Sequence, residues 1–129
     1  MDKRTVELQD RLIYYAVSVM SLVAVLPDSV AGRHIAGQLL RSGTSPAPNY
    51  GEAVSSESRN DFVHKIQIAL KELRESDVWL KIICRAKWID SSERLVPLFK
   101  ETDELISILV ASSRTARRNT KMATDENNR

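Results

Sequence analysis

The chain has 129 residues, of which 43% are hydrophobic and 28% charged, and its formal net charge is +2. This length suits one domain with a substantial core, and this composition excludes a largely disordered chain. Aromatic residues make up only 5% of the sequence, glycines number 4, and Leu, Ile, Val, Ala, Glu, Lys and Arg dominate. Because this balance favours helices over strands, we expect an all-α domain.

Positive charge gathers at the C-terminus. Residues 111–129 hold five basic and two acidic residues, a net of +3, whereas residues 1–110 hold 14 basic and 15 acidic residues, a net of −1. Contacts with phosphate dominate nucleic-acid binding and need local positive charge. Only the C-terminal segment, or local clustering elsewhere, can supply that charge.

The cysteine and hydropathy patterns exclude two further classes of protein. The single cysteine, Cys84, precludes an internal disulfide and a cysteine metal cluster, and it fits a reduced, cytoplasmic setting. The longest apolar run, residues 12–26, is short of the ~20 residues that a membrane-spanning helix needs. We therefore expect neither a membrane span nor a signal peptide.

The first predicted helix covers about residues 4–26 and has apolar residues on two faces. One face carries a seam at alternating spacings of four and three, and the opposite face carries Ile13, Val17 and Met20. A four-helix bundle buries only one stripe of each helix. We therefore expect another subunit to cover the second face. The alternative is a broad core stripe with a few exposed apolar side chains, which protein surfaces tolerate.

The second predicted helix runs from Asp28 or Ser29, both good N-caps, to about Ala53. Pro46 and Pro48 interrupt its pattern. Each proline lacks an amide hydrogen and clashes with the preceding turn, so the helix should bend or break at this point.

The third predicted helix spans about residues 57–87. Its two apolar rows become polar at the same level, Ser76 and Asp77, and a buried carboxylate is costly without partners. This level should therefore face a polar group on another helix. A second candidate contact surface on this helix comprises Val78, Trp79 and Ile82, since aromatic anchors are enriched at interfaces. The alternative is partial burial of the aromatic side chain against a neighbouring helix or loop.

The fourth predicted helix begins at Asp90, with Glu93 completing a capping box, and reaches about Thr115. Basic residues follow it, and the residues after Lys121 are polar and expected to fray. We therefore divide the chain into a bundle domain, residues 1–116, and a basic then polar tail, residues 117–129.

Three segments carry a family resemblance. Residues 37–45, the run Asn49-Tyr-Gly-Glu-Ala53, and residues 58–76 followed by Trp79-Leu80 closely resemble the bacterial four helix bundle protein family. This family was first noticed as reading frames inside intervening sequences of 23S ribosomal RNA genes. The resemblance implies an antiparallel up-and-down four-helix bundle that assembles as a homopentamer. It also implies a distant similarity to the accessory variability protein of diversity-generating retroelements, which binds nucleic acid and a reverse transcriptase.

Four polar residues form the nearest approach to a chemical site: Asn49, Glu52, Glu75 and Asp77. Their carboxylates could act as an acid and base pair or bind a metal. Carboxylate metal sites in bundles use Glu-x-x-His motifs from two helices, however, and none occurs in the sequence. We expect these four residues to form structural hydrogen bonds between helices, and we expect no catalytic, cofactor or metal site.

Arg114, Arg117, Arg118 and Lys121 are the candidate nucleic-acid-binding residues. The other interpretation is that cations at a helix C-terminus complement the helix dipole and keep the helix end soluble. Two functions remain open. One is a non-enzymatic homo-oligomer that acts on RNA or DNA, or with an enzyme such as a reverse transcriptase. The other is a structural or protein-interaction scaffold.

Overall fold

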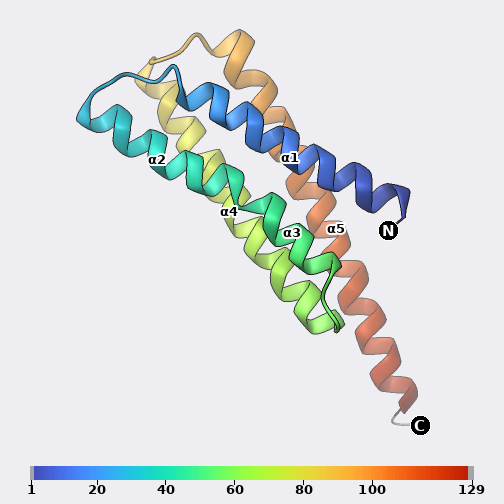
Figure 1. Ribbon diagram of the computed structural model, residues 1–129. Coiled ribbons are helices and arrows are strands. Elements are labelled where there is room, and N and C mark those ends of the chain that lie inside the picture. The colour runs from blue at the N-terminus through green and yellow to red at the C-terminus, as the bar shows by residue number, and fades with distance from the viewer. Residues whose placement is uncertain (1, 128–129) are drawn as a thin grey trace.

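The described part of the chain folds into helices joined by short turns. The computed structural model describes residues 2–127, without the side chains of residues 91, 92, 120, 123, 124 and 127. Its elements are α1 (Lys3–Val23), α2 (Val30–Thr44), α3 (Pro46–Val54), α4 (Arg59–Ala86), the π-helical turn η1 (Ser91–Leu95) and α5 (Val96–Asn127). Because α2 and α3 lie end to end (Figure 1), they act as one interrupted helix. The predicted antiparallel up-and-down four-helix bundle is confirmed.

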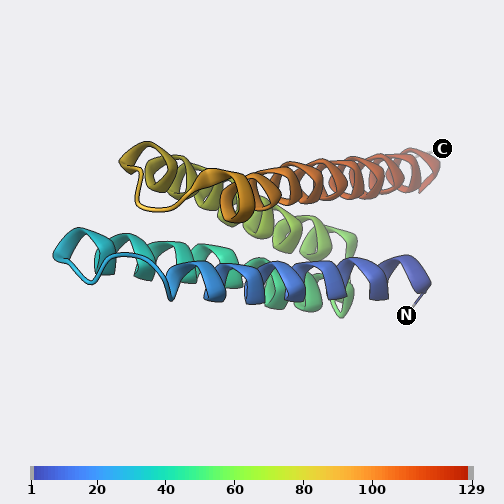
Figure 2. The same cartoon turned by 90° about the horizontal axis from the view of Figure 1, so that it is seen from above.

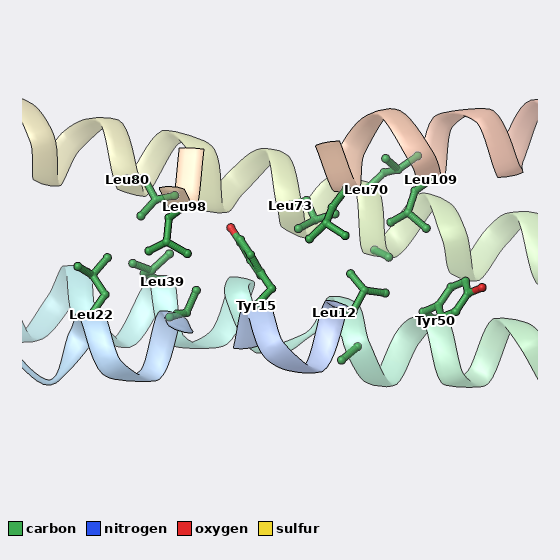
Figure 3. Packing of buried hydrophobic residues seen from close by; sticks show 14 of the residues in the cluster. Leu12, Tyr15, Leu22, Leu39, Tyr50, Leu70, Leu73, Leu80, Leu98 and Leu109 are labelled. Carbon is green, nitrogen blue, oxygen red and sulfur yellow. The ribbon is translucent and has the colours of Figure 1, made fainter. Parts of the chain in front are cut away.

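The four helices of the bundle enclose one apolar core. α1 packs against α2, α3 and α5, and α4 packs against the same three, so α1 and α4 occupy one diagonal of the bundle (Figures 1 and 2). As the first and third helices of an up-and-down bundle, α1 and α4 run in the same direction. Side chains such as Leu12, Leu39, Leu73 and Leu98 converge between the two layers (Figure 3).

Serine caps begin two of the helices. The hydroxyl of Ser29 accepts a hydrogen bond from the amide of Gly32 at 3.0 Å, and the hydroxyl of Ser58 accepts one from Asp61 at 3.1 Å. The expected start of the second helix at Ser29 is therefore confirmed. α1 ends at Val23, three residues earlier than expected, because the chain tightens into a turn before Pro27.

The predicted interruption at the two prolines is confirmed. α2 ends at Thr44 and α3 begins at Pro46, so both Pro46 and Pro48 lie in the first turn of α3. Amide groups there have no partner within the helix, and proline loses nothing by lacking one. Ser45 keeps helical dihedral angles, with φ −69° and ψ −36°. The break therefore leaves α3 running on in the direction of α2.

Gly43 lies where α1 and α2 approach closely. A Cβ atom added at this glycine would lie 2.7 Å from Cγ2 of Val19, closer than real contacts allow. Val19 is fully buried and branched, so it has little room to move. This explains why a small residue occupies an inward position in the second helix.

A buried polar layer crosses the middle of the core. The Tyr15 hydroxyl lies 2.8 Å from Oγ1 of Thr102, which donates a hydrogen bond to the carbonyl of Leu98. At the same level the Ser76 hydroxyl donates to that of Ser42 at 2.8 Å. The expectation that Ser76 faces a polar group on another helix is confirmed, and all four helices of the bundle contribute a hydroxyl.

The last helix differs from its expected bounds at both ends. The chain enters it through η1 rather than directly from Asp90, and α5 then continues to Asn127. The residues after Lys121, which we expected to fray, are therefore helical as far as Asn127. The core stripe of α5 ends earlier, at the buried Ser113. The C-terminal part of α5 extends beyond the packed bundle (Figure 1).

The close approach of α1 and α2 predicts opposite effects at two glycines. Gly43→Ala should lower the free energy of unfolding by about 1 to 3 kcal/mol, because the new methyl group overpacks the core against Val19. A Cβ at Gly37 meets nothing within 4 Å. Gly37→Ala should therefore raise the free energy of unfolding by about 0.5 to 1 kcal/mol. Urea denaturation of both variants measures the difference, and equal stabilisation would show that the helices are not close at Gly43.

Tyr15 should make stability fall in alkaline solution. Burial is the main cause that raises the pKa of Tyr15 to about 12, whereas hydrogen bonds with Thr102 and Ser76 lower it in part. As pH rises from 10 to 12 the unfolded chain loses a proton that the folded chain keeps, so the wild type loses about 2 to 3 kcal/mol over this range. Tyr15→Phe should start about 0.5 to 1.5 kcal/mol less stable at neutral pH and lack this loss. Denaturation midpoints from pH 8 to 12 that run parallel for the two proteins would contradict this assignment.

Candidate nucleic-acid interface

The C-terminal part of α5 presents its cations on one side. Arg114, Arg117, Arg118 and Lys121 are all exposed. Their spacings of three, one and three residues place them within about 100° of one another around the helix. This face points away from the stripe that includes Leu109 and Ser113 and packs into the core. The structure thus brings together the four residues that the sequence singled out for nucleic-acid binding.

A hollow of about 700 Å³ lies on the other side of α5, at the same end of the bundle. It is lined by Arg4 of α1, Arg59 of α4 and a row of α5 residues that includes Thr115 and Asn119. By helical periodicity the centre of this row lies about 140° around α5 from the centre of the four cations. Arg4 and Arg59 therefore belong to a separate surface.

Arg11 also lines the hollow, but acidic residues of α5 engage its charge. Its guanidinium group forms ion pairs with Glu101 and with Glu104, the latter at 2.9 Å. The hydrogen bond with Glu101 is the main cause that raises the pKa of Arg11. Arg11 therefore fastens α1 to α5, and its positive charge is already balanced within the chain.

The outer face of α4 carries a basic row that the sequence analysis missed. Lys71, Arg74 and Arg85 are exposed, and none of them has an acidic partner among the described residues. The balanced charge of residues 1–110 concealed this row, because acidic residues elsewhere in the bundle offset its charge in the total. The signal in the sequence was a helical spacing of basic residues along one stripe.

The structure separates the four residues of the expected polar motif. Asn49 donates hydrogen bonds from Nδ2 to the carbonyl and hydroxyl oxygens of Ser45, at 3.0 and 2.9 Å, within its own helix junction. Glu52 forms an ion pair with Lys65 of α4. The expected link from Asn49 and Glu52 to Glu75 is wrong, because α3 lies beside an earlier part of α4. Asn49 and Glu52 therefore each bond to a partner of their own rather than to a shared polar cluster.

Glu75 and Asp77 also have partners of their own. Glu75 forms an ion pair with Arg41 of α2 and accepts a hydrogen bond from Nε1 of Trp79 at 3.3 Å. Asp77 pairs with Lys81 one turn along the same helix, at 2.7 Å. Asp77 therefore lies beside the polar core level rather than within it.

Trp79 is anchored within its own chain. Its ring packs edge to face with His34 of α2 at a centroid distance of 6.3 Å, and it is only partly exposed. Its neighbours Val78 and Ile82 are 53% and 39% exposed. Of the three residues predicted for a contact surface on this helix, Val78 and Ile82 are the ones that face solvent.

The second apolar face expected on α1 is exposed in the single chain. Ile13 is 47% exposed, Val17 50% and Met20 53%. Val6 and Tyr14 extend this face. This exposure fits both expectations, a face that another subunit covers and a few apolar side chains tolerated at the surface.

The described residues offer neither a metal site nor a membrane-spanning helix. No group of three or more His, Cys, Asp or Glu side chains within this part of the chain could hold a metal ion. None of its helices combines the length and the apolar character that crossing a bilayer requires.

Fold and surface together define an all-α four-helix-bundle protein with a basic helical extension. The sequence model of the 23S rRNA-intervening sequence protein family matches residues 4–111, and the chain belongs to this family. Its fold is similar to the crystal structure of a protein of unknown function from the S23 ribosomal protein family of Bacteroides thetaiotaomicron. The two chains are 31% identical with a TM-score of 0.76, over 82% of this chain and 97% of the other. No curated protein matches the chain. The four cations of α5 lie beyond the residues that the family model matches.

Asn49 and Glu52 should differ in their effect on stability. Asn49→Ala removes two hydrogen bonds at the partly buried junction of α2 and α3, and should lower the free energy of unfolding by about 1 kcal/mol. Glu52→Ala removes only an exposed ion pair, and should cost less than about 0.5 kcal/mol. Chemical denaturation of both variants checks this order. A larger loss for Glu52→Ala would point to a role in joining the helices after all.

Proposed function

We propose that this protein is a non-enzymatic homo-oligomer that binds nucleic acid through the C-terminal part of α5. It would act as an accessory protein that works with RNA or with a nucleic-acid enzyme such as a reverse transcriptase. One observation carries the proposal: Arg114, Arg117, Arg118 and Lys121 are exposed on one face of a helix that extends past the bundle core.

The chemistry of this face suits phosphate. Three of its four cations are arginines, whose planar guanidinium groups bind phosphate oxygens with two hydrogen bonds at once. The four side chains follow the helix for about 10 Å, enough to reach neighbouring phosphates of one strand. No aromatic residue lies between Arg114 and Lys121 to stack on bases. Binding through this face would therefore be weakly selective for sequence.

Oligomerisation would strengthen a modest cluster of charges. The exposed apolar face of α1, with Ile13, Val17 and Met20 about half exposed, supports association of copies of the chain. Several basic helices on one assembly would bind a single nucleic acid at high effective concentration. The resemblance described above implies five copies.

A protein-interaction scaffold is the second candidate function. It is favoured by the net charge of −1 over residues 1–110 and by the exposed apolar side chains of both α1 and α4. In that case the cations of α5 would keep the extension soluble. They cannot complement the helix dipole, because none of them lies in the last turn of α5.

Neutralising the basic face should abolish most of the binding. A variant with glutamine at Arg114, Arg117, Arg118 and Lys121 removes the phosphate contacts, so its affinity for a fluorescent RNA or DNA should fall by more than about tenfold at physiological salt. The slope of log affinity against log salt should decrease by about 3 to 4 units, as expected for four lost contacts. Fluorescence anisotropy at several salt concentrations measures both quantities.

A matched variant controls for net charge. Arg4, Arg59, Arg94 and Lys100 are exposed, and glutamine at these positions removes the same charge elsewhere on the chain. This variant should keep most of the affinity. Equal losses in the two variants would contradict the assignment to α5. If the wild type does not bind at low salt, the scaffold function is the better conclusion.

A further inference from the structure

Two exposed stripes with apolar centres lie at opposite corners of the bundle. We define the α1 stripe as Val6, Asp10, Ile13, Val17 and Met20, and the α4 stripe as Lys71, Arg74, Val78, Ile82 and Arg85. All ten residues are exposed, and both stripes follow the spacings of three and four that bring helices together along a seam. Each stripe therefore has the pattern of a helix contact but no helix against it within the described chain.

The two stripes face in opposite directions. On α1 the stripe lies about 140° around the helix from the row of Leu8, Leu12 and Val19 that packs into the core. On α4 the stripe lies about 150° from the core-facing row that includes Leu73 and Leu80. Since α1 and α4 occupy one diagonal of the bundle, one stripe of a subunit is free to meet the other stripe of a neighbour. Contacts between unlike faces are heterologous and extend from copy to copy.

Charge follows the same order along both stripes. On α1 the acidic Asp10 follows Val6 and precedes Ile13, Val17 and Met20, and on α4 the basic residues Lys71 and Arg74 precede Val78 and Ile82. Among the described residues Asp10 has no cationic partner, and neither basic residue has an acidic one. Parallel packing of the two stripes would bring Asp10 beside Arg74, and Ile13 and Val17 beside Val78 and Ile82.

The direction of the helices permits this parallel packing. α1 and α4 run the same way within a subunit (Figure 1), and a rotation about an axis along the bundle preserves that direction in the next subunit. A contact of two α4 stripes across a twofold axis is disfavoured, because antiparallel packing would bring Arg74 near Arg85 of the other copy.

We propose that the α1 stripe of one copy packs in parallel against the α4 stripe of the next. This contact deepens the proposed function, because it rests on the homo-oligomer and specifies its interface. Asp10 of one copy lies near Lys71 and Arg74 of the other, and Ile13, Val17, Val78 and Ile82 form the centre. Copies add head to tail, and the assembly closes into a ring when the rotation from copy to copy brings the last copy against the first.

Two variants, each with one blocked stripe, test the pairing. Val17→Asp places a charge in the α1 stripe and Ile82→Asp in the α4 stripe, and each should weaken self-association about a hundredfold. Each variant alone should be a folded monomer, since both side chains are already exposed. Mixed together they should form a 1:1 heterodimer that grows no further, because one intact α1 stripe meets one intact α4 stripe. Native mass spectrometry and sedimentation velocity measure this, with Val30→Asp as the control at an exposed valine off both stripes.

Charge reversal within this heterodimer tests the direction. Asp10→Arg added to the Ile82→Asp chain should raise the dissociation constant about fivefold, and so should Arg74→Asp added to the Val17→Asp chain. The two reversals together should restore the original affinity. Absence of rescue overturns the parallel arrangement, because an antiparallel contact would place Asp10 near Arg85 instead.

Other outcomes separate the interface from the proposed function. An oligomeric wild type in which Ile82→Asp assembles unchanged, or forms a dimer by itself, overturns this interface and leaves the homo-oligomer standing. A monomeric wild type at micromolar concentration overturns both. The nucleic-acid titration of the α5 variants is independent of either result.

Discussion

The buried polar layer of Tyr15, Ser42, Ser76 and Thr102 is the constraint on which the arrangement of the bundle depends. Apolar side chains can slide past one another at little cost, whereas a buried hydroxyl without a partner costs about 1 to 3 kcal/mol. Moving any helix by one turn would leave at least one hydroxyl of this layer unpaired. The layer therefore sets the axial register of all four helices.

The axial register of the helices at the polar layer also explains why Ser42 and Gly43 of α2 are small. Ser42 needs a partner on α4, and the next residue, Gly43, allows α1 to approach until Val19 touches the backbone of α2. The ion pairs of Arg11 with Glu101 and of Arg41 with Glu75 lie around this level and connect neighbouring helices at the surface. The middle of the bundle is thus tightly specified, while its outer faces and the end of α5 are left for other uses.

Those outer surfaces divide into chemically different regions. α5 carries four cations beyond the core, whereas the α1 stripe and the α4 stripe combine apolar centres with charges of opposite sign. A basic face with exposed arginines suits a polyanion, and a face with an apolar centre suits another protein surface. The assignment of nucleic acid to α5 and of subunit contact to α1 and α4 follows this division of chemistry, and it allows both to occur at once.

The sequence by itself determined the helices, the cap at Ser29, the break at Pro46 and the two-sided character of α1. Each of these follows from local chemistry: hydrogen bonds of a cap, the missing amide of proline, or the period of the helix. It also placed the four cations of α5, because spacing along one helix fixes which side chains share a face. Only the tertiary structure decided which side chains of neighbouring helices lie opposite one another. In the folded chain Asn49 donates hydrogen bonds to Ser45 and Glu52 forms an ion pair with Lys65. Trp79 packs against His34, whereas Val78 remains exposed. These pairings depend on the rotation and axial position of neighbouring helices, which emerge only when all four pack around one core.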